Sequence, residues 1–351
     1  MDSYQYFMNI RIIYLGKVSP LRSQSVYRGL AASMREESTP ILVFLRPDSP
    51  FVSVGMHQNV QSEIDTQWCN AKKLPVIQRP VGGGTVYLDE QQLFFQYVFP
   101  KNQLPTRPEE IYKLLLQPVV QTFRSIGLTS THIEKNDIHY QGKKICGTGA
   151  ATLDNASVCV GNFLFDFSHK SMAHCISSPS NAFKHCFAEL LTEKITTINQ
   201  ELSKQPTDDQ LIHLMSLHIK EVIGLNPVYD ELTDKEYRAI QDIETTDDDN
   251  DWEYGFNKRL IKHGIKITST HYLLENSVLS DDSLVYLRVL TNNDSVERIW
   301  IESSSKSLIL QNLQLTINET KPSLYELKQL LFFHFPESNS AIRALLEFNP
   351  Y

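Results

Sequence analysis

The chain has 351 residues, a formal net charge of −8 at pH 7 and 41% hydrophobic residues. This length exceeds one typical hydrophobic core and predicts two domains. The acidic balance argues against a nucleic-acid-coating protein, and no apolar run approaches the ~20 residues that span a bilayer, so we expect neither nucleic acid nor membrane as a partner.

The first half of the chain alternates predicted helices and strands. Residues 22–37 predict an amphipathic helix, because Val26, Leu30 and Met34 recur at helical spacing and Ser23 can cap it. A longer helix is predicted over 108–128, kinked at Pro118 and stopped by Gly127, with further helices over 62–74 and 207–224. Short strands are predicted over 40–46, 51–55, 74–80, 85–89, 93–99 and 157–167, and 136–151 predicts a hairpin followed by a glycine-bearing loop.

An acidic stretch, 242–255, is the clearest boundary in the sequence. Its aspartates Asp247, Asp248, Asp249 and Asp251 repel one another, which predicts a solvated linker. Strands are then predicted over 265–274, 283–290, 295–303 and 307–317, followed by a helix over 323–335. We therefore expect a domain of residues 1–246 and a second, small α+β domain of residues 247–351.

Three consecutive glycines, Gly82 to Gly84, fit neither the GxxxxGK[ST] phosphate loop nor a GxGxxG turn that opens a helix. The residues that follow, Thr85, Val86 and Tyr87, favour a strand. Glycines at a strand edge leave N–H groups bare, so an anion or a long apolar chain can approach the backbone. Arg79 adds a planar fork for a phosphate or carboxylate. The alternative is a bulge that only turns the chain.

A second cluster follows in the predicted hairpin. Asn136–Asp137 opens a strand, Lys143–Lys144 closes its turn, and Gly147 and Gly149 come next. A lysine beside a glycine loop can neutralise a phosphoryl oxygen, and an adjacent aspartate can hold Mg²⁺. The alternative is an exposed hairpin with two solvated lysines.

Together the two stretches resemble the lipoate–protein ligase A family, within the wider group of biotin and lipoate ligases. That family has an arginine before S/T-GGG-x-V-x-H-D, and later N-D and K-[IV]-S-G-[ST]-A; this chain reads RPVGGGTVYLD and ND…KKICGTGA. VSVGMHQN is similar to the family's G-x-x-Q-N turn, with Gly55, Gln58 and Asn59. DWEYGFN is similar to the W-x-x-G stretch that opens its accessory domain. The likeness runs from about Ser25 to the C-terminal helix.

The resemblance implies an α+β catalytic domain of the biotin/lipoate ligase, class II synthetase-like type, in which helices flank a mixed sheet, and a small accessory domain. It implies a cytoplasmic enzyme that uses ATP and Mg²⁺ to convert lipoate to lipoyl-AMP. The lipoyl group then passes to a lysine of a lipoyl-domain acceptor. Such acceptors are E2 subunits of 2-oxoacid dehydrogenases and the glycine cleavage H protein.

The resemblance also assigns roles to residues. Lys144 is the catalytic cation on the carboxylate and α-phosphate, and Arg79 orients the acyl-phosphate. Asn136 and Asp137 hold the adenylate, and Asp137 is the Mg²⁺ ligand. The full predicted set of binding residues is Arg79, Val81, Gly82, Gly83, Gly84, Thr85, Val86, Asn136, Asp137, Cys146, Gly147, Gly149 and Gly161.

Four positions depart from the family pattern. Val81 replaces Ser or Thr, Leu88 replaces His, Val160-Gly161-Asn162 replaces H-G-T, and Cys146 replaces Ser. Each change removes a hydrogen-bonding group from the expected pocket. Two alternatives therefore stay open: an ATP-independent octanoyl or lipoyl transferase between carrier proteins, and a lipoyl-domain binder without catalysis.

A transferase needs a nucleophile, and related transferases place a cysteine before the hairpin, where this chain reads STHIEKND. Cys146 is the available candidate, because Lys144 lies close enough in sequence to lower its pKa. The alternative is a small residue that takes the place of a serine.

The chain has five cysteines, an odd number with no CxxC pair, which favours a reducing cytoplasm over disulfides or a zinc ribbon. The pairs His174–Cys175 and His185–Cys186 fit no common zinc spacing and predict a loop over the active site. Trp252 and Tyr254 are predicted to anchor the packing of the second domain.

Overall fold

The computed structural model describes residues 8–248, 264–280, 283–303, 322–327 and 329. The chain forms two compact units. The first comprises Met1–Ser177 and Thr192–Asn257, and the second comprises Ser178–Leu191 and Lys258–Tyr351. Residues 178–191, from the middle of the chain, therefore belong to the second unit. The predicted division at residue 246 does not include this segment in the second domain.

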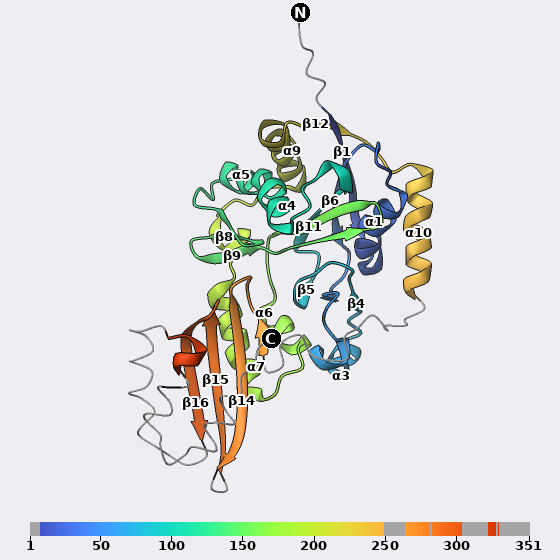
Figure 1. The fold of residues 1–351 in the computed structure, drawn as a ribbon. Helices are drawn as coiled ribbons and strands as arrows, with labels where there is room; N and C mark the ends of the chain where they lie inside the picture. Colours follow the sequence, from blue (N-terminus) through green and yellow to red (C-terminus); the bar gives the residue numbers. More distant parts are fainter. Residues whose placement is uncertain (1–7, 249–263, 281–282, 304–321, 328, 330–351) are drawn as a thin grey trace, which may run out of the picture. The chain divides into compact units, whose positions relative to one another are not determined.

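Six strands form the main sheet of the first unit. They are β1 (Asn9–Val18), β2 (Ile41–Pro47), β6 (Gln92–Pro100), β10 (Thr148–Leu153), β11 (Ala156–Leu164) and β12 (Asn226–Tyr229). Their order is β10-β11-β6-β2-β1-β12 (Figure 1). β1 runs parallel to β2 and β12, whereas β6 is antiparallel to β2 and β11. The predicted mixed sheet is confirmed, and the predicted glycine-bearing loop is wrong, because residues 148–153 pair with β11 as β10.

Helices flank this sheet. The longer ones are α1 (Pro20–Ser33), α4 (Pro108–Leu115), α5 (Gln117–Ser125), α9 (Asp208–His218) and α10 (Asp234–Asp248). Most of a further long helix, α7 (Asn181–Lys194), belongs to the second unit. The shorter helical segments are α2 (Val60–Glu63), α3 (Thr66–Ala71), α6 (His169–Cys175), α8 (Ile198–Glu201), η1 (Lys101–Gln103) and η2 (Ile219–Ile223).

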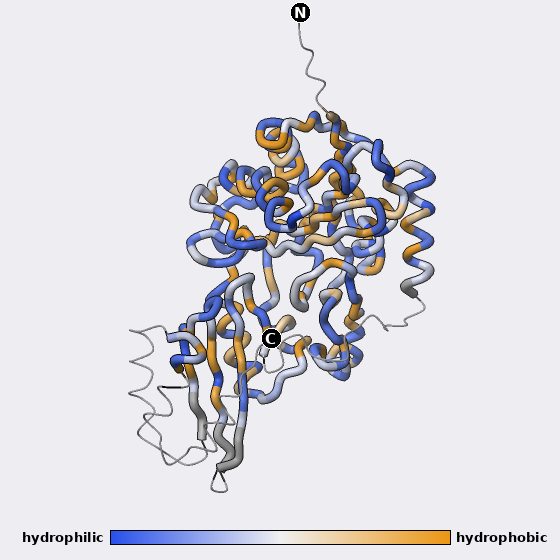
Figure 2. Tube along the Cα trace, viewed as in Figure 1, coloured by the Kyte–Doolittle hydropathy of each residue, from blue (hydrophilic) through white to orange (hydrophobic). Residues whose placement is uncertain are grey.

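Both faces of the sheet are buried, as the all-buried strand β6 shows. Leu93, Phe95 and other alternate side chains pack in a cluster with α4, α5 and α9. Phe94 and Val98 point the other way, into a cluster with α1 and Ile240 of α10. In Figure 2 the hydrophobic residues concentrate on the strands, and the outer helices carry mixed faces. Period-two alternation thus builds two cores on one sheet.

Helix ends follow local chemistry, with two differences from the sequence prediction. The side chain that caps α1 is Ser19, followed by Pro20 in the first turn, so the prediction of Ser23 as cap is wrong; Ser23 is buried and donates to the Pro20 carbonyl. The predicted helix over 108–128 is interrupted at Leu116, two residues before Pro118, because proline belongs in the first turn of a helix. Gly127 then ends this region at φ +108°.

The acidic stretch is helical where the structure describes it. α10 continues through Asp248, so the predicted linker is wrong for Asp247 and Asp248, and the remainder, including Trp252 and Tyr254, lies outside the described residues. The helix persists because it packs along α1: Ile240 is buried there and Glu244 receives two bonds of 2.8 Å from Arg22. Tertiary packing outweighs the repulsion between acidic neighbours.

Gly29 of α1 permits the closest approach between α1 and α10. A Cβ at this position would lie 2.6 Å from both the Cα and N atoms of Ile240. At an open helical site, Gly→Ala stabilises a protein by ~0.5–1 kcal/mol. Here we expect Gly29→Ala to destabilise by ~1–3 kcal/mol, since the backbones must separate. Chemical denaturation measures this, and a stabilised variant would contradict the packing described.

Two small sheets complete the first unit. β3 (Phe51–Val54) lies between β4 (Val76–Gln78) and β5 (Val86–Leu88). The other sheet contains β7 (His132–Glu134), β8 (Asp137–Tyr140) and β9 (Lys143–Cys146). The predicted hairpin is confirmed, and its turn places Gln141 and Gly142 at φ +49° and +78°.

The second unit holds an antiparallel sheet, β13-β14-β15-β16. Its strands are β13 (Gly264–Lys266), β14 (His271–Ser280), β15 (Ser283–Asn292) and β16 (Ser295–Ser303). Glu275 and Arg288, on neighbouring strands, form a buried ion pair, and the hydroxyl of Ser180 donates to Glu275 over 3.1 Å. This bond attaches the 178–191 segment to the sheet. Of the predicted C-terminal elements, 324–327 is helical, and the strand over 307–317 lies outside the described residues.

Candidate active site

The glycine turn, residues 81–84, connects β4 to β5 and is organised by Arg79. One terminal nitrogen of Arg79 donates to the carbonyl and hydroxyl of Ser53 (2.9 and 3.2 Å), and the other donates to the carbonyls of Gly82 and Gly84 (3.1 and 2.7 Å). The turn is therefore wrapped around a guanidinium group.

The glycines in this turn face different surroundings. Gly83 has φ +102°, and a Cβ there would lie 2.9 Å from Arg79 Nη2. A Cβ on Gly55, in the preceding turn, would lie 2.0 Å from the Gly83 carbonyl oxygen. A Cβ on Gly82, by contrast, would meet no atom within 4 Å. Gly55 and Gly83 thus serve internal packing, and Gly82 presents bare backbone to open space.

Arg79 is a cation with neutral partners. Burial lowers the pKa of its guanidinium to about 10, which leaves the group charged at neutral pH. Every oxygen that Arg79 contacts in the described part of the chain belongs to a carbonyl or a hydroxyl. A half-buried charge with only neutral partners among these contacts favours an incoming anion.

Lys144 lies on β9, opposite His139 of β8. Its Nζ atom lies 2.9 Å from Asp137 Oδ1, and the Asp137 side chain is almost fully buried, whereas that of Lys144 is 19% exposed. The main chain of Lys144 is fixed as well, because its carbonyl accepts from Thr196 N over 2.9 Å. The lysine and aspartate selected from the sequence thus form one ion pair with an accessible ammonium.

The glycines after this hairpin bring the two stretches together. A Cβ on Gly149 would lie 3.2 Å from the Gly82 carbonyl oxygen, so the glycine turn rests on β10. A Cβ on Gly147 would lie 3.2 Å from Lys144 Nζ, and one on Gly161 would lie 2.4 Å from Phe95. These glycines are needed for close packing: Gly147 lies against the Lys144 ammonium, and Gly149, two residues later, lies against the glycine turn.

The predicted polar residues Asn136 and Thr85 form hydrogen bonds within the protein, to a backbone group and to a side chain respectively. Asn136 Nδ2 donates to the Thr148 carbonyl over 3.3 Å, and the Thr148 hydroxyl donates back to the Asn136 carbonyl. Thr85 donates to Gln58 Oε1 over 3.1 Å, and the same oxygen accepts from Gly55 N. Asn136 and Thr85 therefore hold the two turns in place.

Most of the residues that depart from the family pattern lie in apolar surroundings. Val81 and Leu88 are buried in the cluster beneath α1, and Val160 packs against it, so apolar packing replaces the hydrogen bonds expected there. Val86, the remaining predicted residue, is half-buried against the same cluster.

Cys146 is fully buried, and its thiol donates to the Gly147 carbonyl over 3.6 Å. Burial raises the pKa of this thiol to about 12, which outweighs the neighbouring Lys144. A protonated, enclosed thiol is a poor nucleophile. Lys144 does lower the pKa of this thiol, as expected, but its effect is smaller than that of burial, so the thiol is not activated.

Two amides outside the predicted set of binding residues connect elements of the site. Gln92, on β6, is 1% exposed and accepts from Asn162 Nδ2 over 2.6 Å, and Asn162 Oδ1 accepts from Gly147 N over 3.2 Å. Asn162 thus contributes hydrogen bonds where a loss was expected. The available signal was the presence of two glutamines, Gln92 and Gln96, in a largely apolar buried strand.

The His–Cys pairs lie on helices, so the predicted loop over the site is wrong. His174 and Cys175 end α6, and His185 and Cys186 belong to α7. His174 stacks on Trp68 with ring centroids 5.5 Å apart, and both cysteines are buried. Within the described ranges, no group of three or more His, Cys, Asp or Glu side chains is arranged to hold a metal ion.

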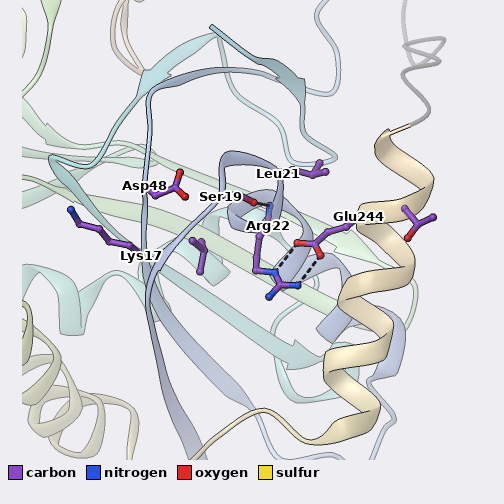
Figure 3. A pocket seen from close by; sticks show the side chains of 8 residues that line it. Lys17, Ser19, Leu21, Arg22, Asp48 and Glu244 are labelled. Carbon is purple, nitrogen blue, oxygen red and sulfur yellow. Dashed lines mark hydrogen bonds and ion pairs between the residues drawn. The ribbon is translucent and has the colours of Figure 1, made fainter. Parts of the chain in front are cut away.

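An open hollow of about 670 Å³ lies at the N-terminal end of α1. Figure 3 shows Arg22 and Glu244 turned toward one another across it, joined by two bonds of 2.8 Å. This pairing neutralises the guanidinium, and none of the predicted site residues lines the hollow. The hollow is therefore separate from the candidate active site.

No helix in the described part of the chain combines the length and apolarity needed to cross a bilayer.

Comparison with known proteins relates the chain to a family. The family model described as "Lipoyl protein ligase A/B catalytic domain" matches residues 19–220. The lipoate-protein ligase LplJ of Bacillus subtilis is 24% identical over 211 residues, which cover 59% of this chain and 62% of that protein. The chain thus aligns with less than two thirds of this relative's length. The octanoyltransferase LipM of the same organism is 21% identical over 271 residues, covering 70% of this chain and 97% of LipM.

A solved structure has the same fold. It is that of a bi-partite lipoate protein ligase with its E2 lipoyl domain from Thermoplasma acidophilum, with a TM-score of 0.64 and 21% identity. It covers 70% of this chain and 96% of the other. This agreement confirms the predicted catalytic fold, in which helices flank a mixed sheet.

Proposed function

Because the chain belongs to the lipoyl protein ligase A/B catalytic-domain family, we propose that it is an ATP-dependent lipoate–protein ligase. The observation that carries this proposal is the Lys144 ammonium, which Asp137 holds at 2.9 Å and which lies against Gly147, two residues before the Gly149 position that meets the turn organised by Arg79. A carboxylate that attacks a phosphate faces charge repulsion, and two fixed cations offset it.

The residues fit an acyl-phosphate anion. Arg79 is charged with only neutral partners in the described structure, and Gly82 offers bare backbone toward open space. Asp137 fits Mg²⁺ less well, because its Oδ1 already contacts an ammonium and a second cation would be repelled. Mg²⁺ is therefore best regarded as the ion carried by ATP, and its direct binding by Asp137 stays a prediction.

The proposed reaction has two steps. In the first, a lipoate carboxylate oxygen bonds to the α-phosphorus, and the bond from that phosphorus to pyrophosphate breaks. Lys144 offsets the charge on the reacting oxygens, and Asp137 keeps the ammonium oriented. In the second, the amine of an acceptor lysine attacks the acyl carbon, the bond to AMP breaks and the amine loses a proton. Arg79 keeps the glycine turn closed around the reacting groups.

A transferase that takes octanoyl or lipoyl groups from a carrier protein is the second candidate, supported by the likeness to LipM across 97% of that protein. Two observations favour the ligase. The same alignment covers 70% of this chain, which has a second compact unit, and the five cysteines are all buried. A non-catalytic lipoyl-domain binder is less favoured, because it does not require an accessible ammonium.

Mass spectrometry of a lipoyl-domain acceptor tests the proposal. The purified protein is incubated with acceptor, Mg²⁺ and an equimolar mixture of lipoate, octanoate and biotin, with and without ATP. We expect an acyl group on the acceptor lysine only with ATP, and lipoyl as the main product. Acylation from an octanoylated carrier protein without ATP would instead identify a transferase, and binding without acylation would identify a binder.

Cys146→Ser separates the two enzymes further. We expect this variant to keep ATP-dependent lipoylation within about tenfold of the unmodified protein, since one altered hydrogen bond is worth ~1 kcal/mol. Cys159→Ser, at an equally buried cysteine of β11, is the matched control. An acyl thioester trapped on Cys146, or transfer abolished by Cys146→Ser alone, would refute the ligase mechanism.

A further inference from the structure

A line of hydrogen bonds connects the two halves of the candidate site. Gln92 Nε2 donates to the Tyr87 carbonyl over 3.3 Å, Asn162 Nδ2 donates to Gln92 Oε1 over 2.6 Å, and Gly147 N donates to Asn162 Oδ1 over 3.2 Å. Tyr87 lies on β5, directly after the glycine turn, and Gly147 directly follows β9, which carries Lys144. We call Gln92 and Asn162 the amide pair.

The amide pair is unusual for its place in the sheet. Gln92 is 1% exposed at the start of β6, where the neighbouring side chains are apolar. Burying a carboxamide is unfavourable unless each polar atom is satisfied, and two apolar residues would fill the same space without that requirement. All three donors point in the same direction along the line, so each bond polarises the next.

Of the two ends of this line of hydrogen bonds, Gly147 is the one that lies next to the proposed catalytic lysine. Its Cα lies so close to Lys144 that an added Cβ would be 3.2 Å from both Cε and Nζ of the lysine. From the other side, a Cβ on Gly161 would lie 3.0 Å from the Gly147 carbonyl oxygen. The Gly147 backbone thus packs directly against the Lys144 ammonium. A shift of this backbone therefore changes the position of Nζ.

We propose that Asn162 and Gln92 are positioning residues for the activation step, because they hold the Gly147 backbone beneath Lys144 and fix it relative to the glycine turn. This inference rests on the proposed function for its kinetic consequence, although the position of the lysine is measurable without any activity. In this proposal Asn162 acts through Gly147 and Lys144.

A double-mutant cycle tests the kinetic consequence. We expect Asn162→Leu and Gln92→Leu each to lower kcat for lipoate-dependent pyrophosphate release by about tenfold to a hundredfold. KM for the acceptor in the complete reaction should stay unchanged. Because both residues act in one line, the double variant should lose no more activity than the more damaging single variant. Asn226→Leu makes the same chemical change at a half-buried position of β12 and should retain full activity.

Asn162→Asp refines the test, because it keeps the acceptor for Gly147 N and loses the donor to Gln92. We expect its kcat to lie between those of the unmodified protein and Asn162→Leu. Effects of the two single leucine variants that multiply in the double variant would overturn the proposal. So would an Asn162→Leu variant with normal kcat.

Labelling of lysines tests the structural part independently of ligase activity. An amine-acylating reagent is added at low conversion to the folded full-length protein, and mass spectrometry compares Lys144 with Lys143 as an internal reference. We expect the Lys144/Lys143 labelling ratio to change at least severalfold in Asn162→Leu and to stay constant in Asn226→Leu. A constant ratio in both variants would overturn the proposal, even if the protein proves not to be a ligase.

Discussion

Replacement of Lys144 by alanine is expected to lower the rate of lipoate-dependent pyrophosphate release by ~10²–10³, the typical loss when one preorganised electrostatic donor is removed. The reason is geometric: the ammonium is held 2.9 Å from Asp137 and lies against Gly147, two residues before the Gly149 position that meets the turn organised by Arg79. No other cation of the hairpin has this arrangement among the contacts described. The release of pyrophosphate is measured with saturating ATP and lipoate and without acceptor.

A loss of stability must be separated from this loss of rate. Lys144→Ala leaves the Asp137 carboxylate buried without its ammonium, which is destabilising by up to ~3–5 kcal/mol for a buried pair. The double variant Lys144→Met, Asp137→Asn removes both charges and should fold more stably than Lys144→Ala yet remain equally inactive. Lys143→Ala is the matched control in the same turn and should keep full activity. Activity in the folded double variant would reject the role assigned to the ammonium.

Gly83→Ala is expected to have the second largest effect. Its φ of +102° is unfavourable for alanine, and the added Cβ would lie 2.9 Å from Arg79 Nη2. The variant must strain its backbone, at ~1–3 kcal/mol, and displace the guanidinium from the carbonyls of Gly82 and Gly84. We expect lower stability in chemical denaturation, together with at least a tenfold loss of pyrophosphate release.

Gly82→Ala is the natural control, because it inserts the same methyl group one residue away, where no atom lies within 4 Å. We expect its unfolding free energy to stay within ~0.5 kcal/mol of the unmodified protein. A loss of activity in this stable variant then reports a substrate that approaches the bare backbone, seen as a raised KM for lipoate or ATP. Equal stability and activity of Gly83→Ala and the unmodified protein would contradict the described role of Arg79.

The glycines illustrate which features of the site could be predicted from the sequence. Their position between two strands was readable from the residues, and their link to a distant lysine followed from the family resemblance. In the structure, a Cβ on Gly149 would lie 3.2 Å from the Gly82 carbonyl oxygen. Their separate roles were not readable. Gly83 accommodates the side chain of Arg79, and Gly55 accommodates the Gly83 carbonyl, so each requirement comes from a neighbour that only folding supplies.

Tertiary packing also explains the other differences. α10 remains helical through Asp248 because it packs on α1, although the charges alone predict a linker. The 178–191 segment belongs to the second unit through partners such as Glu275, far along the chain. Gln92 and Asn162 lie 70 positions apart and meet only because β6 and β11 are neighbours in the sheet. None of these contacts has a local sequence pattern.

The central claim is that Lys144 and the glycine turn together hold the acyl-phosphate of a lipoyl adenylate. The most direct measurement is a crystal structure of the protein with a non-hydrolysable lipoyl-adenylate analogue. We predict that Lys144 Nζ lies within hydrogen-bond distance of the acyl-phosphate linkage. We also predict that the ligand contacts the backbone of Gly82. An analogue bound elsewhere, or an ammonium that contacts Asp137 alone while the ligand is bound, would contradict the account.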